Sequence, residues 1–225
     1  MQLAAKAHSI DNAYELNKGE LVKINHLLGI VVRPKTKEHC GLAAVVNASK
    51  CRWYTVLTYC PYLNELGYDG SCGLVTKACS MEDGKSNTEM IKQLKTELEK
   101  KDINRSIALP PADRHYFPAF DSYRLTKKNG YLPAINELQL LTDEKELFLL
   151  YVQLEKGLHG VDMTDEQGKC LLWSSTDAQK SYSDDDCHER YYSDAFAIDT
   201  DTEGLSSVLT VRKTEDAWVI PYCRF

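Results

Sequence analysis

The spacing of apolar residues divides the chain into early strands, central helices and late strands. Two short runs rich in Val and Ile, residues 28–32 and 41–48, predict buried strands joined by a turn. Residues 51–80 have no clean period, and their structure stays open. From residue 170 onward, apolar and polar residues alternate, which predicts antiparallel strands. Four such strands are expected, at 170–176, 193–200, 205–212 and 217–225.

Helical spacing dominates the middle of the chain. Residues 86–100 carry an apolar stripe, and Ser86 with Glu89 forms a capping-box pair at its start. A second helix is expected at 120–128, and a later one is expected to end at Gly157.

The segment NGYLPAINELQLL, residues 129–141, predicts a short helix with a sharp entry. Pro133 keeps the residue before it extended and suits the first helical position, where its missing N–H costs nothing. Ile135, Leu138 and Leu141 then form one apolar stripe.

Strands, helices and then an antiparallel sheet make an α+β pattern. At 225 residues the chain is long enough for one large domain, which we expect to span 1–225. It would hold N-terminal strands and an aromatic loop region at 20–80, helices at 86–157 and antiparallel strands at 170–225.

Charge and hydropathy exclude several classes of partner. The formal net charge is −6 and no basic stripe is present, so nucleic acid is not an expected partner. No apolar run reaches the length of a membrane span, and the N-terminal residues lack the apolar core of a signal peptide. We therefore expect no membrane insertion, and a cytoplasmic or virion-associated protein, or a cell-surface one if a leader was removed.

Eight cysteines are many for this length, yet no two have the C-x-x-C spacing of zinc ribbons or thioredoxin-like sites. We expect reduced, buried thiols. Disulfides among the five cysteines between residues 40 and 79 are the alternative for an oxidising compartment.

Three motifs together, NGYLPAINELQLL, LLWSST at 171–176 and the closing VIPYCRF, resemble the domain at the C-terminus of a bacterial collagen-like adhesin, found in gut bacteria and their phages. The resemblance implies a C-type-lectin-like fold related to the formylglycine-generating sulfatase modifiers, with helices packed on a small twisted antiparallel sheet. In that fold the last strands and their loops present a ligand site, and some relatives are targets of diversity-generating retroelements. Two positions depart from the family pattern: Tyr131 stands where it has Trp, and Ile220 where it has Arg.

Candidate catalytic and metal sites all have simpler explanations. The hydroxyls of Ser174–Thr176 lack the strained turn of a serine nucleophile and are expected to bond backbone groups beside a core Trp173. Adjacent Cys187 and His188 point to opposite faces of an extended segment, and the C-terminal cysteine pair that binds copper in the modifier enzymes is missing. The stretch DTDTEG at 199–204 is expected to be a hairpin turn, not a calcium loop. We expect no enzyme activity, no metal and no cofactor.

The segment SYSDDDCHERYYSD, residues 181–194, has the Tyr, Ser and Asp composition of antibody binding loops. We therefore expect a non-catalytic module that recognises a protein or glycan on another surface, with this segment as a possible retroelement-variable region. The alternatives are a structural subunit of a fibre or virion, and an oxidase of the modifier type. The expected ligand-binding residues are Tyr182, Asp184, Asp186, His188, Arg190, Tyr191, Tyr192, Trp218 and Tyr222.

Overall fold

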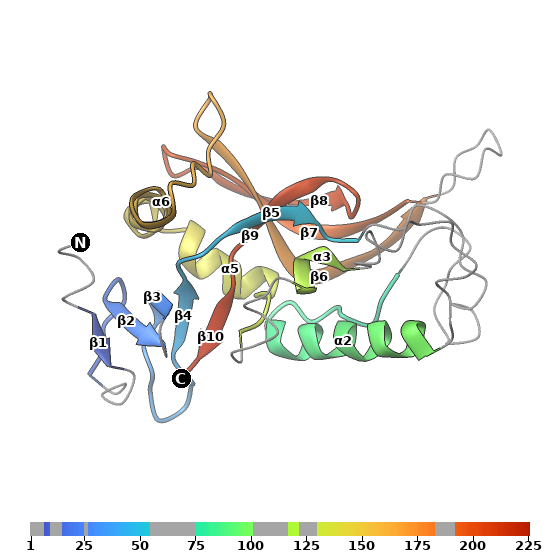
Figure 1. Ribbon diagram of the computed structural model, residues 1–225, viewed down its shortest axis with the longest axis horizontal. Helices are drawn as coiled ribbons and strands as arrows, with labels where there is room; N and C mark the ends of the chain where they lie inside the picture. The colour runs from blue at the N-terminus through green and yellow to red at the C-terminus, as the bar shows by residue number, and fades with distance from the viewer. Residues whose placement is uncertain are drawn as a thin grey trace.

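The computed structural model describes residues 7–9, 15–24, 27–54, 75–100, 117–121, 130–182 and 192–225. These residues form helices and two five-stranded sheets, which confirms the α+β class (Figure 1). The expectation of one small antiparallel sheet is wrong, because there are two sheets and each contains one parallel pair of strands. The C-type-lectin-like topology stays a prediction.

The first sheet has the strand order β1-β2-β3-β4-β10. Its strands are β1 (His8–Ser9), β2 (Leu21–Ile24), β3 (Leu27–Arg33), β4 (Leu42–Val45) and β10 (Tyr222–Arg224). Strands β3 and β4 confirm the prediction that the apolar runs at 28–32 and 41–48 form strands. The two strands pair antiparallel, with a register shift between Val31 and Arg33.

The second sheet has the order β5-β9-β6-β7-β8. Its strands are β5 (Ser49–Arg52), β6 (Lys169–Tyr182), β7 (Tyr192–Asp201), β8 (Ser206–Arg212) and β9 (Asp216–Val219). The three neighbours β6, β7 and β8 pair antiparallel as expected.

The single strand expected at 217–225 is two strands in two sheets. Strand β9 pairs with β5 and β6, whereas β10 pairs with β4 in the other sheet. Pro221 stands at the change of sheet, because it has no N–H to give to a ladder. Its carbonyl still accepts from the Val45 N–H at 2.7 Å.

Four helices are described: α2 (Gly84–Lys100), α3 (Pro118–Asp121), α5 (Ile135–Thr142) and α6 (Lys145–His159). Helix α2 is capped by Asp83, whose Oδ1 accepts from the Ser86 N–H at 3.0 Å. The predicted capping role of Ser86 is therefore wrong, because that residue already lies inside the helix. Only the start of the helix expected at 120–128 is described, as the end of α3.

Helix α6 runs past its predicted end. Gly157 lies inside the helix, and Gly160 provides the left-handed C-cap with a φ of 68°. A left-handed residue at this position favours glycine because no side chain clashes with the backbone. The sequence has glycine at both positions, and the later one, Gly160, ends the helix.

Helix α5 contacts β6, the strand that carries Trp173. The Ser175 N–H donates to the Pro133 carbonyl at 2.8 Å, and the Ile135 N–H donates to Thr176 Oγ1 at 3.1 Å. The helix begins at Ile135, with Ala134 as N-cap, rather than at Pro133. Ala134 is extended, with a φ of −65° and a ψ of 164°, and the Pro133 carbonyl before it is bonded to β6.

The buried apolar residues form three clusters. Helices α5 and α6 lie between the two sheets, where apolar residues of both sheets meet Leu138, Phe148 and other residues of these helices. Helices α2 and α3 cover the opposite face of the second sheet, around Trp53 and Trp173. Alternation along β6 places Leu172 in the first of these clusters and Trp173 in the second. A third cluster covers the outer face of the first sheet.

Candidate functional site

Most of the predicted ligand-binding residues lie outside the described part of the chain. These are Asp184, Asp186, His188, Arg190 and Tyr191. Tyr182 and Tyr192 are described as backbone only, where they pair at the ends of β6 and β7. That pairing anchors the two ends of the segment at one end of the second sheet.

The two remaining predicted residues differ from each other. Tyr222 is fully buried and packs between the sheets, so it cannot extend an exposed surface. The reason is the change of sheet at Pro221, which directs the β10 side chains into the core. Trp218 is partly exposed and lines a pocket.

The pocket around Trp218 has a volume of about 280 Å³. It lies where β5, β9 and the beginning of β6 meet the segment that follows α6. The lining residues are Lys50, Asp162, Met163, Thr164, Asp165, Lys169, Cys170, Leu171, Asp199, Asp216, Ala217 and Trp218. The pocket therefore combines one aromatic ring with two ammonium groups and four carboxylates.

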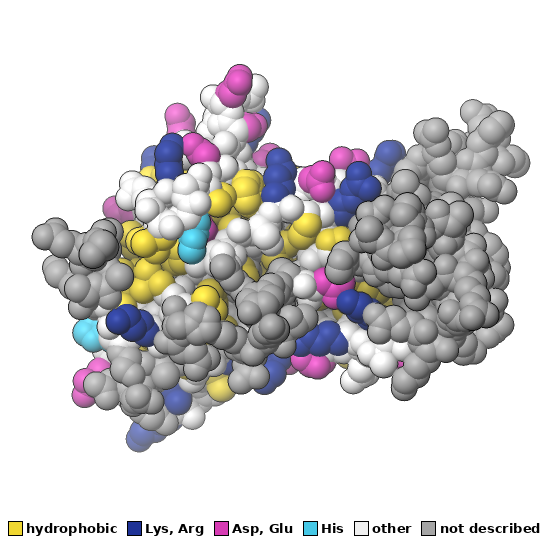
Figure 2. Space-filling view, viewed as in Figure 1, with side chains coloured by type: hydrophobic (Ala, Val, Ile, Leu, Met, Phe, Trp, Pro, Cys, Tyr) yellow, Lys and Arg dark blue, Asp and Glu magenta, His cyan; other side chains and the backbone are white. Residues whose placement is uncertain are grey.

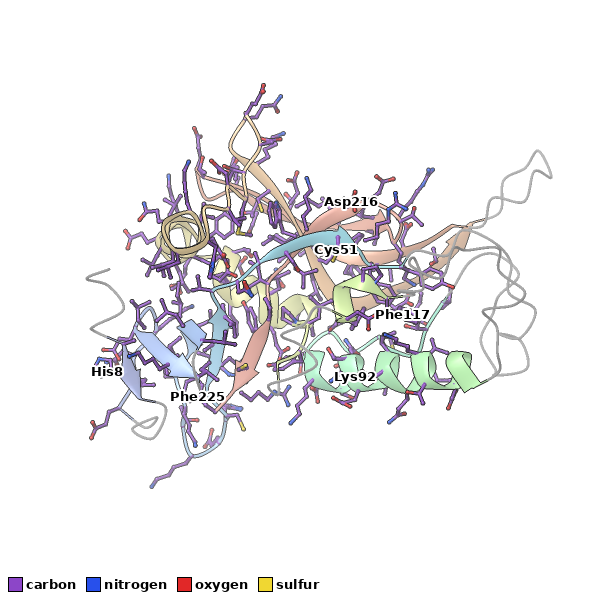
Figure 3. The ribbon with its side chains drawn as sticks, viewed as in Figure 1. His8, Cys51, Lys92, Phe117, Asp216 and Phe225 are labelled. Carbon is purple, nitrogen blue, oxygen red and sulfur yellow. The ribbon has the colours of Figure 1, made fainter. Side chains whose placement is uncertain are left out.

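The strand register brings the aromatic and basic groups together. Lys50 is opposite Trp218 in the antiparallel β5–β9 pair, and its Nζ lies 6.0 Å from the centre of the Trp218 ring. Leu172 of β6 pairs with Trp218 from the other side, in the parallel direction. Figure 3 labels Cys51, which follows Lys50 on β5, and Asp216, two residues before Trp218 on β9; the two lie near each other across the β5–β9 pair. Because β9 is held on both sides, the position of Trp218 is fixed by the sheet.

A tight turn shapes the opposite wall. Asp165 Oδ1 accepts from the Gln167 and Lys169 N–H groups, each at 2.8 Å. Gly168 has a φ of 76°, which a non-glycine residue rarely adopts. The turn delivers Asp165 and Lys169 to the same edge of the pocket, at the start of β6.

Charges of both signs surround the pocket and differ in their partners. Asp162 Oδ2 accepts from Lys156 Nζ at 2.7 Å, and this bond lowers the pKa of Asp162. Asp216 lies 4.0 Å from Arg52. In Figure 2, acidic and basic side chains alternate over this upper part of the molecule, around smaller hydrophobic areas. Such a surface presents donors and acceptors side by side.

The sulfur at the pocket belongs to Cys170, which is buried. Burial raises the pKa of this thiol well above its ordinary value, so it is protonated at neutral pH. Burial likewise raises the pKa of Cys51 to about 12. All five described cysteines are free thiols, and two of them, Cys40 and Cys79, are exposed rather than buried as expected.

The Trp-Ser-Ser-Thr segment has the structural role that we expected. Trp173 is fully buried and donates from Nε1 to the Cys51 carbonyl at 3.1 Å. Ser174 Oγ donates to the Phe196 carbonyl at 2.7 Å, and Thr176 Oγ1 accepts from Ile135 N–H. These hydroxyls satisfy backbone groups inside the protein.

The DTDTEG stretch forms the expected hairpin turn between β7 and β8. Asp201 Oδ1 accepts from the Glu203 and Leu205 N–H groups at 2.9 and 3.0 Å. Gly204 follows with a φ of 89°. Across the described ranges, no group of three or more His, Cys, Asp or Glu side chains is placed to hold a metal ion.

No family model matches the sequence, and no curated protein does. One solved structure is similar: a fimbrial protein from Bacteroides ovatus, with 15% sequence identity and a TM-score of 0.46. The match covers 82% of this chain and 36% of that one, so the chain spans about a third of the fimbrial protein's length. The resemblance to the adhesin family stays a prediction. Within the described residues, no helix is long and apolar enough to cross a membrane.

Sequence reasoning did not find the pocket residues other than Trp218. Lys50 is far in the chain from Asp165 and Lys169, and each of the three is an ordinary surface residue in its local context. No local signal in the sequence shows what the turn at Gly168 faces. Only the β5–β9–β6 pairing joins these residues.

Proposed function

We propose that this chain is a non-catalytic recognition module that binds a glycan at the pocket around Trp218. The single observation that carries this proposal is the pocket itself, where a partly exposed indole ring faces a mixture of ammonium and carboxylate groups. Sugar rings present apolar C–H faces and many hydroxyls. An aromatic ring packs against the C–H faces, and charged side chains form hydrogen bonds with the hydroxyls as donors and acceptors.

The size of the pocket suits a small part of a larger ligand. Its volume of about 280 Å³ is slightly below the range of about 300 to 1,000 Å³ that small-molecule sites occupy. A terminal sugar residue of a glycan would fit the pocket while the rest of the chain stays outside.

The chemistry of the lining supports binding rather than catalysis. The Cys170 thiol is held protonated by its burial, and Asp162 is engaged by Lys156. A thiol nucleophile requires a lowered pKa, and here the pKa is raised. The absence of enzyme activity is part of the proposal, and copper analysis with an oxidase assay of the pure protein tests it.

Glycan-array screening followed by calorimetry on the best glycan tests the proposal. Replacing Trp218 by Ala should weaken binding about tenfold or more, as expected for a central aromatic contact. Lys50→Ala should weaken it less, and Lys92→Ala on exposed α2 is the matched lysine control. Finding no glycan ligand, or equal affinity of the Trp218→Ala protein, would show that the pocket is not a glycan site.

The segment 181–194 is a second candidate for ligand recognition, and its predicted role rests on composition. Simultaneous replacement of Tyr182, Tyr191 and Tyr192 by Ala separates the two sites. If this variant loses binding while Trp218→Ala keeps it, the tyrosine-rich segment is the ligand site. A near-repeat template and a reverse transcriptase gene beside this gene would support retroelement variation.

A structural subunit is the second candidate function, and the exposed edge of the second sheet favours it. Strand β8 is an edge strand, and Leu205 and Val208 near its start are 70% and 43% exposed. Exposed apolar edges pair with other chains unless they are protected. Light scattering after size exclusion tests this role. Val208→Lys should dissolve an assembly built on this edge, and a monomeric wild type would exclude it.

A further inference from the structure

A buried lysine and a buried aspartate meet on the face of the second sheet that α2 and α3 cover, and neither lines the Trp218 pocket. Lys213 Nζ lies 2.6 Å from Asp177 Oδ2, with side-chain exposures of 1% and 0%. The Trp53 ring covers the ammonium group at 4.6 Å. The pair is therefore shut off from solvent on a face packed with aromatic rings.

Backbone bonds fix both residues in place. The Lys213 N–H donates to the Ser193 carbonyl at 2.9 Å, and the Asp177 N–H donates to the Ala78 carbonyl at 2.8 Å. Reacting groups held in this way have a high effective concentration, because their orientational freedom was lost on folding.

The carboxylate also has hydrogen-bond donors arranged around it. Thr76 donates to Asp177 Oδ2 from its N–H at 2.7 Å and from Oγ1 at 2.8 Å. Oδ1 accepts from the Gln179 N–H at 2.9 Å. The Thr76 donors are placed to stabilise negative charge on Oδ2, as the donors of an oxyanion hole do.

Desolvation lowers the pKa of Lys213 below its ordinary value, although the negative charge of Asp177 opposes this shift. A proton passing from the ammonium to the carboxylate converts the pair to a neutral amine and a carboxylic acid, which a dry site tolerates better than two charges. The neutral amine is a nucleophile.

We propose that Lys213 and Asp177 are joined by an intramolecular isopeptide bond. Nζ of the neutral amine attacks Cγ of the protonated Asp177 carboxyl, and the Nζ–Cγ bond forms. The Cγ–Oδ1 bond then breaks, and Oδ1 leaves as water with two protons, both of which came from the Nζ ammonium group: one in the first proton transfer and one after the attack. Oδ2 becomes the amide carbonyl oxygen, held by Thr76. The step consumes no oxidant, reductant or co-reactant.

Proton transfer between Nζ and the leaving oxygen requires a carrier. Asp194 is buried and near enough for its charge to act on Lys213. A carboxyl group in that position serves as general base and then as general acid. The inference is independent of the glycan proposal, because none of these residues lines the pocket.

Intact-mass spectrometry of the denatured wild-type protein tests the inference. The expected mass is that of the sequence less one water molecule, and a tryptic digest should contain one branched peptide joining Lys213 to Asp177. The pair Lys156–Asp162 is an internal control, because its atoms lie 2.7 Å apart but its side chains are 66% and 52% exposed. Peptides holding that pair should be linear. A full-length mass with linear peptides around residues 177 and 213 overturns the proposal.

A variant pair identifies the reacting lysine. Lys213→Arg keeps a cation but cannot form the amide, so its mass should equal that of its sequence. Lys156→Arg should still lack one water. A deficit that persists in the Lys213→Arg protein would place the lost water elsewhere and refute the assignment. If Lys213→Arg does not fold, the wild-type mass and branched peptide still decide.

Discussion

Replacing Glu137 by Ala should destabilise the protein strongly, because this buried carboxylate connects three segments. Oε2 accepts from the Gly84 N–H at 3.0 Å and from the Ala134 N–H at 3.1 Å. Oε1 accepts from Tyr131 Oη and from Arg224 Nη2, each at 3.1 Å. One side chain therefore holds the start of α2, the start of α5 and the C-terminal strand β10.

The expected loss of unfolding free energy is about 4 kcal/mol. Each buried donor left without an acceptor costs about 1 to 3 kcal/mol, and breaking a buried ion pair costs about 3 to 5 kcal/mol. Relaxation and the remaining Arg224–Asp83 bond, at 2.7 Å, reduce the loss to below the simple sum of these costs. Glu137→Gln should cost about 1 to 2 kcal/mol, since its amide oxygen can keep both backbone donors.

Urea unfolding followed by tryptophan fluorescence measures the loss. A cost of about 4 kcal/mol lowers the midpoint by about 1 to 2 M urea. Glu144→Ala is the matched control, because Glu144 pairs with Lys18 at 2.6 Å on the surface and should cost less than about 1 kcal/mol. If Glu137→Ala stays within about 1 kcal/mol of wild type, the carboxylate does not join these segments.

Three further predictions follow from helix geometry, burial and exposure. Gly157→Ala should raise the free energy of unfolding by about 0.5 to 1 kcal/mol, because Gly157 lies inside α6 with open space around it. Gly84→Ala should lower the free energy of unfolding by more than that, since the added Cβ would clash with the Ala134 nitrogen. Desolvation raises the pKa of Glu155 in the folded protein. The contribution of this carboxyl to stability is therefore greatest below its unfolded pKa and is lost as the pH rises through its folded pKa. Glu155→Gln should flatten this pH dependence of stability in urea titrations between acid and neutral pH. Native alkylation should modify exposed Cys40 and spare buried Cys170, as peptide mapping would show.

Each of these predictions has a contradicting outcome. A destabilised Gly157→Ala protein would indicate that α6 ends at that glycine. An unchanged pH profile for Glu155→Gln would show that this carboxyl titrates alike in the folded and unfolded states. Rapid alkylation of Cys170 would mean that the floor of the pocket is open to reagents.

The sequence alone determined the strands and helices in which apolar residues recur at regular spacing. The strands β3, β4, β6, β7 and β8 and the α2 and α5 helices follow from apolar spacing, because side-chain direction repeats every two residues in a strand and about every 3.6 in a helix. The short helix after Pro133 was also expected, although it begins at Ile135 rather than at the proline. The hairpin turn at 199–204 needed only its Asp and Gly residues.

Tertiary structure decided the division into two sheets, the helix ends and the candidate sites. Nothing local shows that Pro221 moves the chain from one sheet to the other, or that Tyr222 is thereby buried. Lys213 has the same local pattern as an exposed lysine, and only the packing of β6 against Trp53 buries it beside Asp177. The physical reason is that burial and charge pairing depend on contacts between distant segments, whereas periodicity records only which way neighbouring side chains point.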